Sequence, residues 1–69
     1  MYSNLDAEQA RKGHSNAFVA DMMGISRVSF ENKKKTGKFT AKECKKLCTF
    51  YNSTFEYLFY TNENELIGA

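Results

Sequence analysis

The stretch that decides the fold is Ser15-Asn-Ala-Phe-Val-Ala-Asp-Met-Met-Gly-Ile-Ser-Arg-Val-Ser-Phe-Glu-Asn-Lys33. It predicts two short helices joined by the turn Gly24-Ile25-Ser26, which also supplies the serine that caps the second helix. Gly24 permits the positive φ that a tight turn needs, and Ala20 is small where the two helices would cross closely. This stretch therefore predicts a helix-turn-helix.

Three further helices are predicted around this pair. The first spans about residues 5–12, with Ser3 as its N-cap and Gly13 just past its end. A fourth covers residues 41–51, because Thr40 and Glu43 form the T-x-x-E pattern of a capping box. Its inner face would hold Cys44, Leu47, Cys48 and Tyr51, and a short fifth helix would start at Thr54 and carry Phe55, Leu58 and Phe59.

Length and composition indicate one small all-α domain. The chain has 69 residues, no proline, four glycines and ten aromatic residues, which favours helices joined by short turns around an aromatic-rich core. We expect the domain to cover residues 1–62, with residues 63–69 as a flexible or dimer-associated tail. The sequence contains neither a long apolar run nor a signal pattern, which predicts a soluble cytoplasmic protein without a membrane segment.

The charges are distributed unevenly. Residues 11–46 hold all ten basic side chains and three acidic ones, a net charge of +7, whereas the whole chain carries +2. A basic middle between two acidic ends is typical of a protein with a polyanionic partner.

The third predicted helix has two faces. Arg27, Val28, Glu31 and Asn32 fall within one arc, and Phe30 lies opposite as the core anchor. The arc combines side chains that read base edges in the major groove, since Arg binds guanine, Asn binds adenine and an aliphatic group contacts the thymine methyl.

With this pattern the chain resembles the Cro/phage-repressor (XRE-type) helix-turn-helix family, over about residues 4–60. The resemblance rests on Asn4-Leu5, Arg11-Lys12-Gly13, Ser15-Asn16, Val19-Ala20, Met23-Gly24-Ile25-Ser26, Phe30 and Thr54-Phe55-Glu56-Tyr57-Leu58-Phe59. It implies a compact five-helix bundle of the phage repressor DNA-binding type, which places helix 3 in the major groove, commonly as a homodimer on a two-fold operator.

The resemblance also implies site residues. Ser26, Arg27, Val28 and Asn32 would face the bases, and Asn16, at the start of helix 2, would clamp a phosphate with help from the helix dipole. Backbone contacts would come from Lys35 and Lys38, and the run Lys33-Lys34-Lys35 adds Lys33 as a further phosphate-contact candidate. The sequence departs from the family pattern in two ways. Gln9 and Lys34 stand where relatives often pair an Arg with a Glu, and the usual Asn-Gly after helix 3 is shifted, as Lys35-Thr36-Gly37.

Several residues also have a plainer interpretation. Glu31 is better explained as an intrahelical partner of Arg27 or Lys35 than as a cytosine contact. Cys44 and Cys48 are interpreted as reduced core residues flanking Leu47 rather than as metal ligands with His14. For Lys42, Lys45 and Lys46, solvation and DNA contact are equally favoured.

The aromatic residues near the C-terminus exceed what a small core needs, which indicates a self-association surface. The candidates for a dimer interface are Phe59, Tyr60, Leu66 and Ile67.

The sequence therefore predicts sequence-specific binding of double-stranded operator DNA by a transcriptional regulator, a Cro-like repressor of a phage or mobile element. It predicts no enzyme activity, small-molecule substrate, cofactor or metal, because no catalytic set of residues is evident. The alternative is a protein-interaction module, such as an antirepressor or an antitoxin component, that uses the aromatic C-terminal surface.

Overall fold

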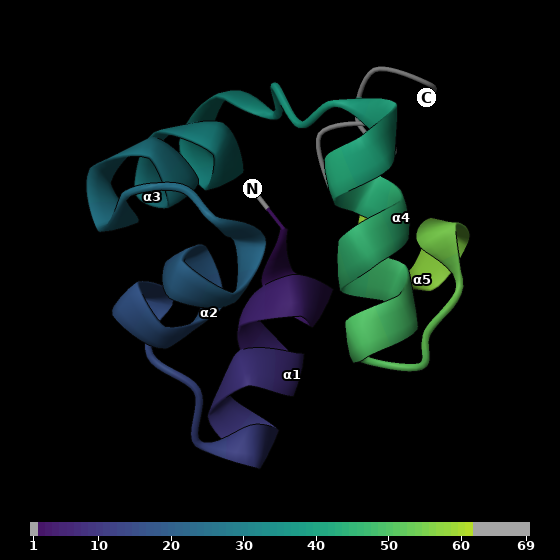
Figure 1. The fold of residues 1–69 in the computed structure, drawn as a ribbon. Helices are drawn as coiled ribbons and strands as arrows, with labels where there is room; N and C mark the ends of the chain where they lie inside the picture. The colour runs from purple at the N-terminus through teal and green to yellow at the C-terminus, as the bar shows by residue number, and fades with distance from the viewer. Residues whose placement is uncertain (1, 62–69) are drawn as a thin grey trace.

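The computed structural model describes residues 2–61, which form five helices and no strand. The helices are α1 (Ser3–Lys12), α2 (Asn16–Met23), α3 (Arg27–Thr36), α4 (Ala41–Phe50) and α5 (Phe55–Leu58). The prediction of an all-α domain with five helices is confirmed, and each predicted helix is present at nearly the expected bounds. In Figure 1 the α2–α3 pair lies on one side of α1, and α4 and α5 lie on the other.

Hydroxyl side chains start four of the five helices. Ser15, Ser26, Thr40 and Thr54 each accept a hydrogen bond from the backbone N–H three residues further on. At α4 the predicted capping box is complete, because the Glu43 carboxylate also accepts from the Thr40 N–H at 2.9 Å. Such caps satisfy N–H groups that have no partner inside the helix.

The start of α1 differs from the prediction. Ser3 is the first helical residue and not the N-cap; that position belongs to Tyr2, which forms no side-chain cap. The Tyr2 ring is buried and packs edge-on against Phe59, with ring centroids 5.2 Å apart. Aromatic packing therefore fixes this helix start in place of a polar cap.

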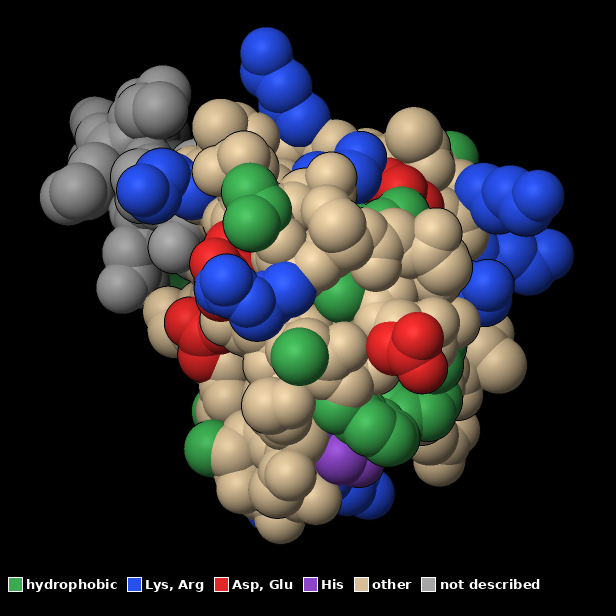
Figure 2. All heavy atoms as spheres, turned by 60° about the vertical axis from the view of Figure 1, so that its left-hand side comes forward, with side chains coloured by type: hydrophobic (Ala, Val, Ile, Leu, Met, Phe, Trp, Pro, Cys, Tyr) green, Lys and Arg blue, Asp and Glu red, His purple; other side chains and the backbone are tan. Residues whose placement is uncertain are grey.

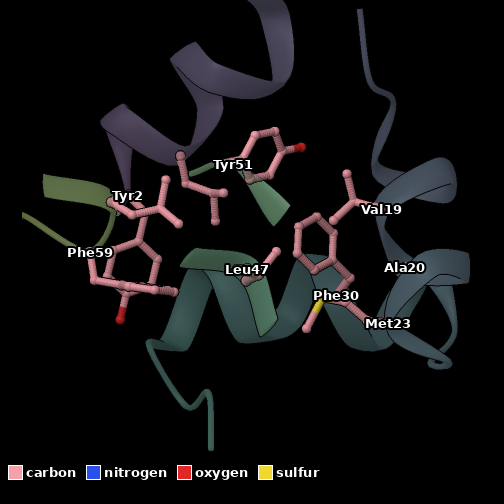
Figure 3. Packing of buried hydrophobic residues seen from close by; sticks show 10 residues of the cluster. Tyr2, Val19, Ala20, Met23, Phe30, Leu47, Tyr51 and Phe59 are labelled. Carbon is pink, nitrogen blue, oxygen red and sulfur yellow. The ribbon is translucent and has the colours of Figure 1, made fainter. Parts of the chain in front are cut away.

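The core draws one fully buried side chain from every helix. Leu5, Val19, Phe30, Leu47 and Leu58 each have 0% exposure. Figure 3 shows the Phe30 ring directed away from α3 toward Val19 and Leu47, where it joins the two sides of the molecule. Burial of this kind supplies most of the stability of a small helical domain.

Three phenylalanine side chains differ in exposure. Phe18 and Phe55, which are large apolar side chains on α2 and α5, are 50% and 56% exposed. Phe59, expected at a dimer surface, is instead 8% exposed and packs against Tyr2 and Phe39. Phe30 and Phe59 are thus the two phenylalanines of the buried core cluster.

The two cysteines flank Leu47 and pack half-buried against the core, with free thiols. Burial raises the pKa of both thiols, which disfavours the reactive thiolate. No group of three His, Cys, Asp or Glu side chains among residues 2–61 is placed to hold a metal ion.

A buried carboxylate joins α1 to α5. Glu8 is 7% exposed and accepts a hydrogen bond of 3.0 Å from the Tyr57 hydroxyl, and Arg11 pairs with the same carboxylate. The Asn4 side chain donates to the Tyr57 carbonyl at 2.8 Å. The Tyr57 hydrogen bond, followed by the Arg11 contact, holds the pKa of Glu8 below its ordinary value of 4.5.

Replacing Phe30 with Ala should remove the central side chain of the core and lower the free energy of unfolding by about 3–5 kcal/mol. Phe18→Ala is the matched control, because the ring at that position is half exposed; it should change stability by less than about 1 kcal/mol. Urea denaturation followed by circular dichroism measures both. Similar losses in the two variants would contradict the assigned core.

The lowered pKa of Glu8 makes stability depend on pH. The ionised carboxylate stabilises the folded state above the unfolded-state pKa, and this contribution is lost as pH falls through the lower folded-state pKa. Glu8→Gln should therefore lose less stability than the wild type between about pH 5 and about pH 3. Urea denaturation at several pH values tests this, and parallel pH curves for the two proteins would disprove the role of Glu8.

Candidate nucleic-acid interface

The outward arc of α3 is exposed as the sequence pattern predicts. With Phe30 fully buried beneath the helix, Val28 is 56% exposed, and Arg27 and Asn32 are also exposed. Ser26, the N-cap of α3, is exposed beside them. Four side chains of different chemistry, a hydroxyl, a guanidinium, an aliphatic group and an amide, thus face outward together.

The α2–α3 pair is held rigidly beneath this arc. Only three residues separate the helices, and Gly24 has a φ of 76°, a left-handed conformation that suits glycine. Its N–H donates to the Asp21 carbonyl, and the Ile25 N–H donates to the Ala20 carbonyl at 3.0 Å. Val19, Ala20 and Met23 bury the inner side of α2 in the same core cluster as Phe30. The turn and the core therefore fix the angle at which α3 is presented.

Arg27 is bonded within its own helix. Its Nη1 donates to both carboxylate oxygens of Glu31 at 2.9 Å, as the plainer interpretation of Glu31 predicted. The Nε and Nη2 groups have no partner within residues 2–61 and stay available to a ligand. Because the pair is exposed, it contributes little to stability and can reorganise.

A continuous run of hydrogen bonds crosses the inner edge of the arc, and we call it the polar chain: Asp6, Lys34, Gln9, Asn16, Glu31 and Arg27. The Lys34 ammonium donates to Asp6 at 2.6 Å and to Gln9 at 2.9 Å. Gln9 donates to the Asn16 side chain at 3.0 Å, and Asn16 in turn donates to Glu31 at 3.1 Å. The polar chain therefore links α1, α2 and α3 through side-chain hydrogen bonds.

The polar chain bears on two expectations. Gln9 and Lys34, which stand at the positions of the pair common in relatives, do meet across α1 and α3, as a neutral–charged hydrogen bond. Asn16, expected to clamp a phosphate, is half-buried with its amide group already bonded on both sides. Sequence reasoning did not anticipate Asp6 or the central place of Gln9, since nothing local in the sequence pairs residues of different helices.

Glu31 keeps its negative charge at neutral pH. The hydrogen bond from Asn16, and secondly that from Arg27, lower the pKa of its carboxyl. A carboxylate in the arc repels phosphates. Its pairing with the Arg27 guanidinium and the Asn16 amide offsets part of this negative charge.

The lysines expected to contact phosphates differ in availability. Lys33 pairs with Glu43 of α4 at 3.2 Å, and both side chains are largely covered. Lys35 and Lys38 are exposed and form no ion pair within the described part of the chain. Figure 2 shows Lys and Arg side chains around the margin of the face that carries α2 and α3.

Two of the four candidate dimer residues lie within the part of the chain that the structure describes, and they differ in exposure. Phe59 is in the core, whereas Tyr60 is 40% exposed. Leu66 and Ile67 lie outside the described residues. The aromatic surplus is nonetheless present at α5, where Phe55 and Tyr57 are also exposed.

Comparison of the chain with known family models, with curated proteins and with solved structures found no match. None of the helices formed by residues 2–61 is long and apolar enough to cross a membrane.

Proposed function

We propose that this protein is a sequence-specific double-stranded DNA-binding transcriptional regulator, with α2 and α3 as a helix-turn-helix and α3 as the helix that enters the major groove. The function resembles that of Cro-like repressors of phages and mobile elements. The observation that carries the proposal is the exposed arc of Arg27, Val28 and Asn32 on a short helix whose opposite side, at Phe30, is fully buried.

Each side chain of the arc has a distinct recognition role. Arg27 would donate through its unpaired Nε and Nη2 groups to guanine, Asn32 would bond adenine, and Val28 would contact a thymine methyl. Ser26, the N-cap of α3, would contact a base edge. The exposed Arg27–Glu31 pair can reorganise when the guanidinium meets a base.

Phosphate contacts would position the protein on the duplex. Lys35 and Lys38 are exposed and have no ion-pair partner among residues 2–61. Lys33 would have to leave Glu43, and Asn16 would have to exchange a bond of the polar chain, so these two contribute less. The N-terminus of α2 supplies backbone N–H groups and a favourable dipole.

A homodimer on a two-fold operator fits the exposed aromatic residues of α5. Phe55 of α5 is 56% exposed, and Tyr60, two residues past the end of the helix, is 40% exposed, so both rings are available for self-association. The same observation favours the second candidate function, a protein-interaction module such as an antirepressor or antitoxin component. Binding to DNA separates the two.

Arg27→Ala should weaken binding to an operator selected from a random duplex pool by about 1–3 kcal/mol and leave the fold intact, because the side chain is exposed. Lys12→Ala, an exposed change on α1, is the matched control and should bind like the wild type. Fluorescence anisotropy measures the affinities. Equal affinity of the wild type and the Arg27 variant would remove Arg27 from base recognition.

Binding to random duplex should be in the micromolar range and fall steeply as salt rises, because phosphate neutralisation releases counterions. The double variant Lys35→Ala/Lys38→Ala should reduce the slope of log K against log salt by about 1–2. An unchanged slope would exclude these lysines as phosphate contacts. No binding of any duplex at low salt would favour the interaction module instead.

A further inference from the structure

A groove lies between α2 and α4, on a part of the surface to which α3 contributes no lining residue. Its volume is about 430 Å³, and it is lined by Met22, Lys42, Lys45, Lys46, Thr49 and Phe50. We call it the α2–α4 groove. Because the base-reading arc lies on α3, an occupant of this groove would leave the arc of Arg27, Val28 and Asn32 uncovered.

An exposed aromatic surface adjoins the groove. Phe50, in the groove wall, is 39% exposed, and Phe18 nearby on α2 is 50% exposed. The His14 ring packs against both, with its centroid 4.6 Å from that of Phe18 and 5.4 Å from that of Phe50. Figure 2 shows hydrophobic side chains gathered beside the histidine. Since the core leaves these rings half uncovered, they offer apolar contact area to a partner.

The rim of the groove is basic. Lys42, Lys45 and Lys46 are exposed, and none forms an ion pair with another residue of 2–61. The Glu43 carboxylate, on the same helix, already pairs with Lys33 and accepts a hydrogen bond from the Thr40 N–H. Asp21 on α2 is the other acidic residue nearby and is also exposed. The rim thus carries three cations against one uncompensated carboxylate, which complements an acidic partner.

The shape suits a helix more than a nucleic acid. The groove follows α4 from Lys42 to Phe50, about two helical turns, and Met22 of α2 borders it. The rings of Phe18 and Phe50 are tilted by 43° with centroids 6.4 Å apart, so they do not form the flat platform on which successive bases stack. An amphipathic helix laid into an apolar groove fits this arrangement.

We propose that the α2–α4 groove binds an amphipathic helix of a partner protein, with large apolar side chains facing Met22 and Phe50 and acidic side chains facing the lysine rim. This interaction goes beyond DNA binding and does not depend on it. It allows the protein to hold a partner through α2 and α4 while α3 is free to contact DNA.

The test uses the full chain and a synthetic helical peptide of about 14 residues with Leu along one face and Glu at its edges. Amide chemical shifts recorded during titration should change most at Met22, Thr49 and Phe50. Lys46→Glu should weaken binding at least about ten-fold by removing one rim cation and adding a repulsive charge. Lys12→Glu, the same charge change on exposed α1, should have little effect.

Phe50→Ala provides a second variant that removes apolar contact without changing charge. This variant should also bind the peptide more weakly, and circular dichroism checks that the variant remains folded. Two further probes are a peptide with every Glu replaced by Lys and a short oligothymidylate. The proposal would be overturned if the acidic peptide did not bind, or if the charge-reversed peptide bound equally well. It would also be overturned if the shift changes lay away from the groove, or if the oligothymidylate bound more tightly at the same amides.

Discussion

The burial of Phe30 is the constraint on which the rest of the structure depends. A helix of ten residues that directs one large ring fully into the core must present the opposite side to solvent. Arg27, Val28 and Asn32 lie on that opposite side and are exposed. The same ring packs with residues of α2 and α4, so the feature that stabilises the domain also orients the surface that we propose for DNA.

The polar chain adds a second constraint at the edge of that surface. Its hydrogen bonds connect three helices in the order Asp6, Lys34, Gln9, Asn16, Glu31 and Arg27. Glu31 stays ionised within it, so a negative charge is kept beside the recognition arc and is balanced by Arg27. In the DNA-binding mode that we propose, this arrangement would favour specific over non-specific binding, because a phosphate would gain less there than a base edge that bonds the remaining Arg27 donors.

Local signals predicted much of the fold. The capping residues Ser15, Ser26, Thr40 and Thr54 act within three residues, and Gly24 needs only its own backbone freedom, so sequence alone located these helix ends. The inward Phe30 and the Arg27–Glu31 pair followed from helical periodicity. Features that depend on packing between distant residues could not be predicted from local patterns. Tyr2 rather than Ser3 is the N-cap of α1, Phe59 is buried in the core, and Phe18 is half exposed. The polar chain and the α2–α4 groove also join residues of different helices, so they could not be predicted before the packing of those helices was known.

The central claim is that the outward face of α3 is the DNA-binding surface, and amide chemical-shift mapping on an operator duplex selected from random sequences tests it most directly. The account predicts the largest changes from Ser26 to Asn32, with smaller ones at the start of α2 and at Lys38. Changes confined to α4 and α5, with the α3 amides unmoved at saturation, would contradict it.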